Sequence, residues 1–408
     1  MSTIATHPTG NRNFRYLIES LAKKKKLTVI FTNINFNSKL KIYKLLPKKI
    51  KSLIKTRDFG FYKNNIISVS PNFEIARVIL HKVNKPFLNL IQNKYFSNHI
   101  FYKRFAICVA KKIKDMKNVE NIYAYEGAAL EIFEEAKKQG IKCIYELPTL
   151  YWKEKEKIYK YEKKKHPNYK KFFISEDTKV FAKRVDKEIN LADQIIVPSL
   201  LVKESLKLHP KKNLNIDILN YPFGKFLKIK KKNWYNNKRK LKILFVGMLE
   251  ARKGLHHIIE TLKLLKISNE LKNFHITIIG NGTMFNNINN DWKEVEFYSS
   301  MPNDLILKKM KNSDIYLSLS SYDGFGLASV EAMSMGMAVI CSKFCGFTDR
   351  CTLNDVIKLN NVTPKKIFNL LMKLKKNPAL IKNIGINALK TCKKYQINNY
   401  KNSLINLI

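Results

Sequence analysis

The sequence predicts an α/β protein with two doubly wound, Rossmann-like domains, each built on a parallel sheet with helices on both faces. In both halves of the chain, short and continuously apolar runs of strand length alternate with longer segments of helical periodicity. Residues 225–240 are rich in basic and polar side chains, a composition shift that marks a linker. We therefore expect an N-terminal domain over residues 1–221 and a C-terminal domain over residues 222–408, facing each other across a cleft. We expect the last helix to pack either on the C-terminal domain or back on the N-terminal domain.

The length and composition fit this division. A chain of 408 residues is long enough for two cores, and a hydrophobic content of 45% is ordinary for a soluble globular protein. No apolar run approaches the roughly 20 residues of a membrane span, and the start of the chain, MSTIATHPTG, lacks the pattern of a signal peptide. We expect a cytoplasmic protein, either free or at the inner face of the membrane. Its six cysteines are scattered without a CxxC pair, which predicts neither a disulfide nor a structural metal.

The formal net charge of +44 has two interpretations. The first is attraction to phosphates, in nucleic acid, anionic lipid or a phosphorylated acceptor. The second is compositional bias, because the chain is rich in Lys, Asn and Ile together. Lysine greatly outnumbers arginine, the residue favoured for planar recognition of phosphates and bases. We favour the bias over specific binding of nucleic acid, and peripheral contact with an anionic membrane is compatible with both.

The N-terminal half opens with a strand over 3–5, a loop, a helix over 13–25 and a strand over 27–31. Gly10 then lies at the carboxyl end of the first strand, the edge where open parallel sheets bind ligands. An ordinary turn is the alternative interpretation of this glycine.

The rest of this half continues the alternation, although the pattern is weakest over 36–118. Within that region, residues 45–54 form a basic amphipathic segment, typical of a helix on a membrane or of a solvated one. Later strands are predicted over 66–69, 122–125, 141–145, 194–197 and 215–219, and helices over 128–139, 180–192 and 199–208.

The C-terminal half repeats the scheme with short apolar strands separated by helices. Strands are predicted over 243–247, 275–280, 295–298, 314–318 and 338–341, and helices over 255–266, 303–311, 327–335, 364–375 and 378–394.

The stretch LSLSSYDGFGLASVEAMSMGMAVIC at 317–341 predicts a strand, a glycine loop, a short helix and another strand. Backbone amides at the start of the helix suit an anion such as a diphosphate. Two carboxylates bracket the loop, Asp323 before the helix and Glu331 within it, and carboxylates suit sugar hydroxyls. The combination fits a nucleotide sugar, and a loop that merely connects two strands is the alternative.

Two further loops follow strands of this half. Arg252 and Lys253 come after the strand that ends at Gly247, where a cation pair would neutralise a leaving diphosphate. Gly280 and Gly282 follow the next strand. We expect them either to lie near the nucleotide or to form a simple turn. Because the chain has 76 basic residues, the presence of two of them is not informative by itself. The position of Arg252 and Lys253 directly after a strand is what favours a role in binding the diphosphate.

Together these segments resemble the group-1 family of retaining glycosyltransferases, which have the GT-B fold. The family's final motif is two acidic residues separated by seven others, here Asp323 and Glu331. The segments that carry the resemblance are HPTGNRNFR at 7–15, ADQIIVPS at 192–199, NYPFG at 220–224, GMLEARKG at 247–254, IIGNG at 278–282 and DGFGLASVEAMSMG at 323–336.

The resemblance implies a role for each matching residue. Glu331 would hold the ribose, Asp323 the transferred sugar, and Arg252 with Lys253 the departing diphosphate, so that Asp323, Arg252 and Lys253 are the catalytic set. Such enzymes retain the anomeric configuration and need no metal or other cofactor, because cations and helix amides do the electrostatic work. The remaining residues expected to contact the donor are Gly324, Phe325, Gly326, Leu327, Gly10, Gly280 and Gly282.

Three positions depart from the family pattern. Asp323 is one methylene shorter than the usual Glu, and Met248 stands where many members have arginine. Many members also carry a histidine after the strand that here ends in Glu146. Three alternatives are open: Glu146 makes the contact in place of the histidine, His7 makes it, or the contact is absent. The candidates for the acceptor side are therefore His7, Asn11 and Glu146.

The sequence thus predicts an enzyme that transfers a sugar from a nucleotide donor to a glycan, a lipid-linked molecule or a small molecule. A basic protein that binds nucleic acid or membrane is the first alternative, although the chain has no RNP, helix-turn-helix or zinc-finger pattern. A related subunit that has lost catalysis is the second.

Overall fold

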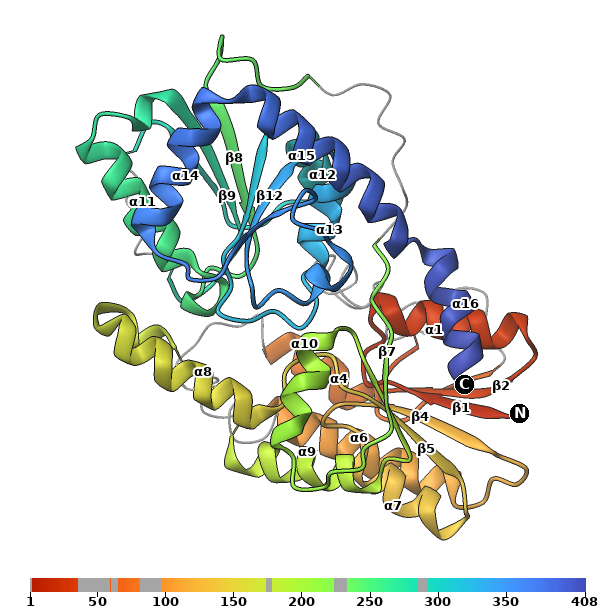
Figure 1. Cartoon of the computed structure of the whole chain (residues 1–408). Helices are drawn as coiled ribbons and strands as arrows, with labels where there is room; N and C mark the ends of the chain where they lie inside the picture. Colours follow the sequence, from red (N-terminus) through yellow and green to blue (C-terminus); the bar gives the residue numbers. More distant parts are fainter. Residues whose placement is uncertain are drawn as a thin grey trace.

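The computed structural model describes residues 2–35, 59, 65–80, 97–173, 178–223, 233–284 and 292–408. Two α/β units are stacked end to end, one around each of two sheets (Figure 1). Every strand pair in both sheets is parallel. The predicted architecture of two doubly wound, Rossmann-like sheets is confirmed. The basic segment 45–54 and Gly224 lie outside the described residues.

The N-terminal sheet has seven strands in the order β3-β2-β1-β4-β5-β6-β7. The strands are β1 (Thr3–Thr6), β2 (Leu27–Thr32), β3 (Ile66–Ser68), β4 (Asn121–Tyr125), β5 (Lys142–Glu146), β6 (Gln194–Val197) and β7 (Ile216–Ile218). The helices are α1 (Arg12–Lys23), α4 (Pro71–Leu80), α6 (Asn98–Ile113), α7 (Leu130–Lys138), α8 (Trp152–Lys165), α9 (Lys179–Leu191) and α10 (Leu200–Ser205), with 3-10 turns η2 (Pro167–Phe172) and η3 (Leu206–Leu208).

The C-terminal sheet has six strands in the order β10-β9-β8-β11-β12-β13. The strands are β8 (Leu241–Val246), β9 (Phe274–Ile279), β10 (Val295–Tyr298), β11 (Ile315–Ser318), β12 (Ala338–Ser342) and β13 (Ile357–Leu359). The helices are α11 (Leu255–Ile267), α12 (Asn303–Lys311), α13 (Leu327–Ser334), α14 (Pro364–Lys376), α15 (Pro378–Thr391) and α16 (Ile397–Leu407), with 3-10 turns η4 (Ala251–Lys253), η5 (Leu271–Asn273), η7 (Gly346–Arg350) and η8 (Cys392–Tyr395).

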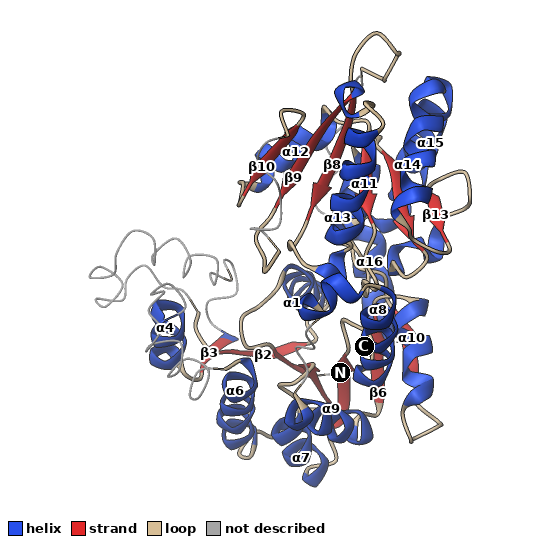
Figure 2. Ribbon diagram, turned by 90° about the vertical axis from the view of Figure 1, so that its left-hand side faces the viewer, coloured by secondary structure: helices blue, strands red, loops and turns tan. Residues whose placement is uncertain are grey.

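Helices cover both faces of each sheet, so the strands are buried on both sides. In the first domain α6, α7 and α9 pack side by side on one face and α1 with α16 on the other (Figure 2). In the second, α11 packs with α14, and α13 packs with α12 and α15. Successive residues of β8 show the result, since Ile243 and Leu244 belong to different buried clusters. Double burial is why the strand runs are continuously apolar.

Strand β13 is absent from the predicted elements. It has only three residues, all half-buried, and one of them is Lys358. A short half-exposed run at a sheet edge lacks both the length and the apolar pattern that identify a strand.

The chain returns to the first domain at its end. Helix α16 packs against α1, where Lys401 Nζ lies 2.6 Å from Glu19 Oε1. Beyond this contact, the side chain of Gln194 in the first sheet donates to the carbonyl of Leu407 at 3.1 Å. The two chain ends therefore lie on the same domain (Figure 1). In the part of the chain that the structure describes, no helix is both long and apolar enough to cross a membrane.

Strand order reverses direction in the same way in the two domains. In each sheet the chain goes to one side first and then to the other, so that β1 and β4, and β8 and β11, are adjacent at the point of reversal. Loops after such strands diverge and leave a crevice in which α/β proteins bind ligands. The loops after β8 and β11 lie next to the first domain, which places the candidate site between the two units.

Candidate active site

A cavity of about 450 Å³ lies at the reversal point of the second sheet. Most of its lining comes from the ends of β8 and β11 and from the start of α13, and the first domain contributes Pro148 and Tyr221. The predicted residues among its lining are Arg252, Lys253, Asp323, Phe325, Gly326 and Leu327, together with Met248. Residues as far apart in the sequence as Pro148 and Ser329 thus meet in one interdomain cavity.

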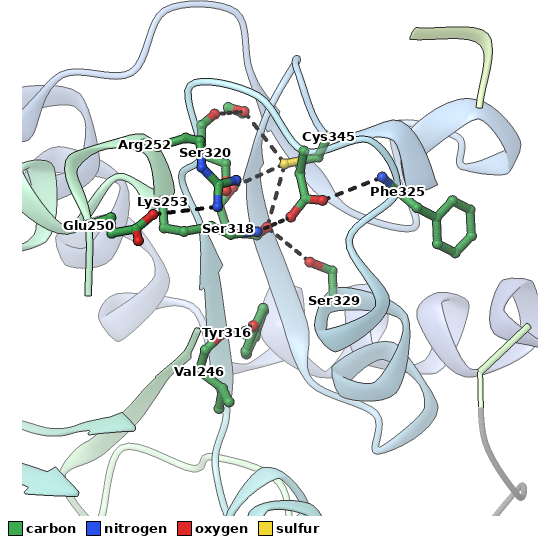
Figure 3. Close-up of polar contacts among 12 residues, drawn as sticks. Val246, Glu250, Arg252, Lys253, Tyr316, Ser318, Ser320, Phe325, Ser329 and Cys345 are labelled. Carbon is green, nitrogen blue, oxygen red and sulfur yellow. Dashed lines mark hydrogen bonds and ion pairs between the residues drawn. The ribbon is translucent and has the colours of Figure 1, made fainter. Parts of the chain in front are cut away.

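The cation pair is held by the turn after β8 (Figure 3). Lys253 Nζ lies 2.6 Å from Asp323 Oδ2, and Arg252 Nη2 lies 3.5 Å from Glu250 Oε2. The Arg252 guanidinium also lies over the ring of Tyr322, 5.4 Å from its centroid. Gly254 ends the turn with φ of +80°, and a Cβ there would lie 2.2 Å from the Leu319 carbonyl oxygen. Only glycine lets the cations approach β11 this closely.

Asp323 is charged in this environment. Burial disfavours the carboxylate, but the attraction of Lys253 and Arg252 and a hydrogen bond from the Phe325 amide outweigh that effect, so the pKa of Asp323 is lowered. The amide of Phe325 donates to Oδ1 at 3.4 Å while Lys253 occupies Oδ2. A fixed carboxylate beside two fixed cations can orient a hydroxyl-rich ligand that carries a negative group.

The start of α13 presents its backbone to the cavity. Gly326, with φ of +92°, is the N-cap, and no side chain caps the helix. The first-turn amides and the positive end of the helix dipole are therefore directed toward the space lined by Arg252 and Lys253. Phe325 contributes its backbone, because its ring is buried against those of Tyr221 and Tyr395, both at 5.6 Å between centroids.

Glu331 is absent from the described lining of the cavity and lies two residues beyond Ser329, the last residue of α13 that lines it. Its Oε1 accepts a hydrogen bond from Arg12 Nη1 at 3.1 Å, and its side chain is 14% exposed. Arg12 begins α1 in the first domain, so this ion pair crosses the interdomain gap and Glu331 faces that gap. Sequence reasoning missed Arg12, although a cation at the start of a helix after the Gly10 loop is a usable signal.

The predicted glycines pack loops closely against each other. A Cβ on Gly280 would lie 1.8 Å from the Gly247 oxygen, and one on Gly282 would lie 2.5 Å from the Leu249 oxygen. These two glycines support the turn that carries the cations and are absent from the described lining of the cavity. Gly324 approaches the first domain, where its Cβ would lie 2.3 Å from the Pro148 oxygen.

Polar side chains beneath the cavity form a network that sequence reasoning also missed (Figure 3). Ser329 donates to Ser318 at 2.9 Å, and Ser318 lies 3.5 Å from the sulfur of Cys345. The network ties α13 to β11 and thereby fixes the position of the helix start.

On the first domain, the loop after β1 folds on itself. The amides of Thr9 and Gly10 both donate to Nδ1 of His7, at 3.1 and 2.9 Å. Asn11 caps α1 by accepting from the Phe14 amide at 2.8 Å. Gly10 has φ of +68°, and a Cβ there would meet the ring of Phe59. His7 and Asn11 thus shape this loop, and their predicted contact with an acceptor stays a prediction.

Glu146 lies at the end of β5 and is 2% exposed. Its two oxygens accept hydrogen bonds from the hydroxyls of Tyr123 at 2.8 Å and Tyr221 at 2.6 Å. Burial raises its pKa, and the two tyrosine hydrogen bonds oppose this only in part. Both carboxyl oxygens are occupied within the protein, while Tyr221 continues to the cavity. In this arrangement Glu146 positions Tyr221, and its predicted place on the acceptor side stays a prediction.

The whole structure is similar in fold to several solved structures. Sucrose-phosphate synthase from Thermosynechococcus elongatus superimposes with a TM-score of 0.67 at 13% identity, over 100% of this chain and 98% of that one. HepE of Anabaena, solved in complex with UDP-glucose, superimposes with a TM-score of 0.61 at 11% identity, over 100% of this chain and 99% of that one. The fold is GT-B, with two facing Rossmann-like domains.

Sequence comparison matches part of the chain to a family. Residues 228–391 match the model of the family described as "Glycosyl transferases group 1". The uncharacterized glycosyltransferase MJ1607 of Methanocaldococcus jannaschii is 30% identical over 114 residues, 26% of this chain and 28% of that protein. An uncharacterized 41.2 kDa protein in the cps region of Klebsiella pneumoniae is 29% identical over 107 residues, again 26% and 28%. The chain thus matches little more than a quarter of the length of either relative.

Proposed function

We propose that this chain is a retaining glycosyltransferase that moves a sugar from a nucleoside-diphosphate donor to an acceptor. The observation that carries the proposal is the interdomain cavity in which Arg252, Lys253, Asp323 and the uncapped start of α13 converge. The match of residues 228–391 to the group 1 family model and the GT-B fold support it. The solved complex of HepE makes UDP-glucose the first donor to test.

In this proposal the diphosphate lies between the cation pair and the amides that begin α13. Charge that develops on the diphosphate as the sugar leaves is stabilised by these fixed groups, without a metal ion. Asp323 contacts hydroxyls of the sugar, and Lys253, which pairs with Asp323 here, bridges the sugar and the phosphate. Glu331 holds the ribose. The short side chain of Asp323 is compensated by the close approach of Lys253.

The acceptor is proposed to enter from the first domain, over the loop after β1 and the Tyr221 side of the cavity. A glycan, a lipid-linked molecule and a small molecule are all compatible with this entry. Peripheral contact with an anionic membrane, with the enzyme at the cytoplasmic face, is the finer proposal that the net charge of +44 supports.

The first test is binding. Thermal-shift and calorimetric titrations with UDP, GDP and ADP are expected to identify one diphosphate that stabilises the protein. Glu331→Ala is expected to weaken that binding by about ten- to 100-fold, the effect of losing a charged hydrogen-bond partner. Binding of none of the diphosphates contradicts the proposal. Affinity for nucleic acid or anionic vesicles that falls steeply with salt and ignores Glu331→Ala favours the basic binding protein instead.

The second test is transfer, measured as release of the diphosphate from the matching nucleotide sugar. Lys253→Met is expected to lower kcat/KM by about 100- to 1000-fold, because it removes one fixed cation from the departing phosphate. Lys309→Met is the matched control, since Lys309 pairs with Glu296 at 2.8 Å on the far edge strand. Tight donor binding without release or transfer, with any acceptor, identifies an inactive subunit.

A further inference from the structure

A second cluster of polar side chains lies at the interface of the domains, apart from the cavity described above. Glu162 and His166 come from the end of α8 and the residue after it, in the first domain. His256 and His257 come from the first turn of α11, in the second. Each of the four offers one ligand atom, and these atoms all lie within 4.8 Å of one another. Helix α8 extends from the first domain alongside the second (Figure 1).

The histidines are closely packed. Ring centroids of His166 lie 4.7 Å from those of His256 and 4.9 Å from those of His257, and the latter two are 3.9 Å apart. Exposure is 1% for His256 and 4% for His257. Such a group is not an ordinary apolar contact, since each ring carries a polar nitrogen into the interior.

Several nitrogen and oxygen atoms of this cluster lack a well-formed hydrogen bond. Nδ1 of His257, Nε2 of His166 and Oε2 of Glu162 are buried with no hydrogen bond among the residues that the structure describes, and both ring nitrogens of His256 are buried beside the backbone of Ala251 without a hydrogen bond of normal geometry. Glu162 Oε2 lies 3.6 Å from His166 Nε2. Buried polar atoms are nearly always satisfied in native proteins, so a group of five without a well-formed hydrogen bond calls for a ligand.

The chemistry of the four side chains suits a cation. Unprotonated imidazole nitrogens and carboxylate oxygens all have lone pairs to donate.

We propose that Glu162, His166, His256 and His257 form a binding site for a divalent transition metal ion, specifically Zn²⁺, that joins α8 of the first domain to α11 of the second. Three imidazoles and one carboxylate are a ligand set that zinc accepts with tetrahedral geometry. Metal–ligand bonds of about 2.0 Å place the ligand atoms of a tetrahedral site about 3.3 Å apart. Displacements of the four ligand atoms by roughly 1 Å, through side-chain rotation, would therefore bring them into coordination distance. Glu162 and His257 also line a second cavity, of about 530 Å³, which gives the ion a route from solvent.

The ion would act on the arrangement of the domains. The histidine pair in α11 follows directly after η4, the turn that carries Arg252 and Lys253. Polar pairs also join α8 or η2 to the second domain, Tyr159 with Tyr322, Lys165 with Asn361 and Tyr169 with Glu260, and the ring of Tyr169 packs against that of His256. A bound ion fixes these domains in the orientation seen here and holds the cation turn in place.

The test uses the full-length protein, stripped with EDTA and titrated with Zn²⁺ against a chromophoric chelator. One ion per chain is expected, with a rise in Tm that EDTA reverses. His166→Asn and His257→Asn are each expected to weaken Zn²⁺ binding by at least about 100-fold, since loss of even an outer contact costs 10- to 100-fold. His275→Asn is the matched control, because His275 lies 3.3 Å from Glu296 on another part of the second domain.

His166→Cys guards against loss of folding, because cysteine is also a zinc ligand. It is expected to retain binding, and its Co²⁺ complex is expected to show the visible absorption of a tetrahedral site with a thiolate ligand. Absence of stoichiometric Zn²⁺ binding by the wild-type chain overturns the proposal. Binding that survives both asparagine variants unchanged also overturns it, because the ion then occupies another site.

Discussion

The chemistry proposed for this protein depends on how single charges are compensated. Asp323 stays ionised although it is half-buried, because Lys253 and Arg252 lie beside it. Glu146 is compensated differently, by two neutral tyrosine hydroxyls, which stabilise a carboxylate less than a cation does. Glu146 and Asp323 therefore have pKa values shifted in opposite directions, although both lie in the interdomain region.

The raised pKa of Glu146 predicts a pH dependence of stability. A group whose pKa is higher in the folded state contributes stability that is fully present below its unfolded pKa, about 4.3, and is lost as pH rises through the folded value. We expect Glu146→Gln, which cannot ionise, to become more stable relative to wild type between about pH 4 and pH 8. Urea unfolding of both proteins across this range measures the difference.

Glu188, also buried with a raised pKa, is present in both proteins and cancels in that comparison. A stability difference between wild type and Glu146→Gln that does not change with pH contradicts the assignment.

At the scale of elements, the site depends on loops that approach each other without side chains between them. Gly324 brings the loop after β11 against the backbone of Pro148 and Thr149, and Ser199 donates to the Gly324 carbonyl at 2.7 Å. This contact is made by main-chain atoms, which cannot rotate aside as a side chain can. It fixes the distance between the loop of the second domain that carries Asp323 and the first domain.

Gly324→Ala is predicted to separate these loops, because the new Cβ would lie 2.3 Å from the Pro148 oxygen. The expected result is a fall in kcat/KM of about 100-fold, the cost of a misplacement near 1 Å at a reacting centre, with each domain still folded. Steady-state kinetics with the donor identified above check this. Gly140→Ala is the control, since Gly140 has a positive φ but no neighbour within 4 Å of a new Cβ. Equal activity of the two variants contradicts the argument.

At the scale of the whole molecule, α16 couples the two domains. It continues from the helices of the second domain but buries Tyr400, Leu404 and Ile408, which are at most 6% exposed, in the cluster that includes α1. The apolar face of α16 therefore supplies much of the attachment.

Leu404→Ala is predicted to lower the free energy of unfolding by about 2–5 kcal/mol, the range for a fully buried leucine. Because α16 belongs to both domains, the loss is expected across the whole transition, measured by urea unfolding. Asn402→Ala, at an exposed position of the same helix, is expected to change stability by less than about 0.5 kcal/mol. A selective loss of the second domain alone, with the first unchanged, contradicts the coupling.

Most elements could be predicted from the sequence because their signals are local. Strands such as β12, with all five residues buried, show as apolar runs, and α13 ends at Ser334, one residue before the end of the predicted helix over 327–335. The loop 323–326 and the cation pair could also be predicted, because each follows a strand directly. Strand β13 lacked such a signal.

The sequence by itself determined two doubly wound domains and the loops that carry Asp323, Arg252 and Lys253, because periodicity, turn preferences and strand ends depend on near neighbours. Tertiary structure alone decided that Arg12 meets Glu331, that Gly324 meets Pro148, and that α8 brings His166 to the histidine pair of α11. These contacts join residues about 90 to 320 positions apart. No local pattern records them, because they arise from the way the domains dock.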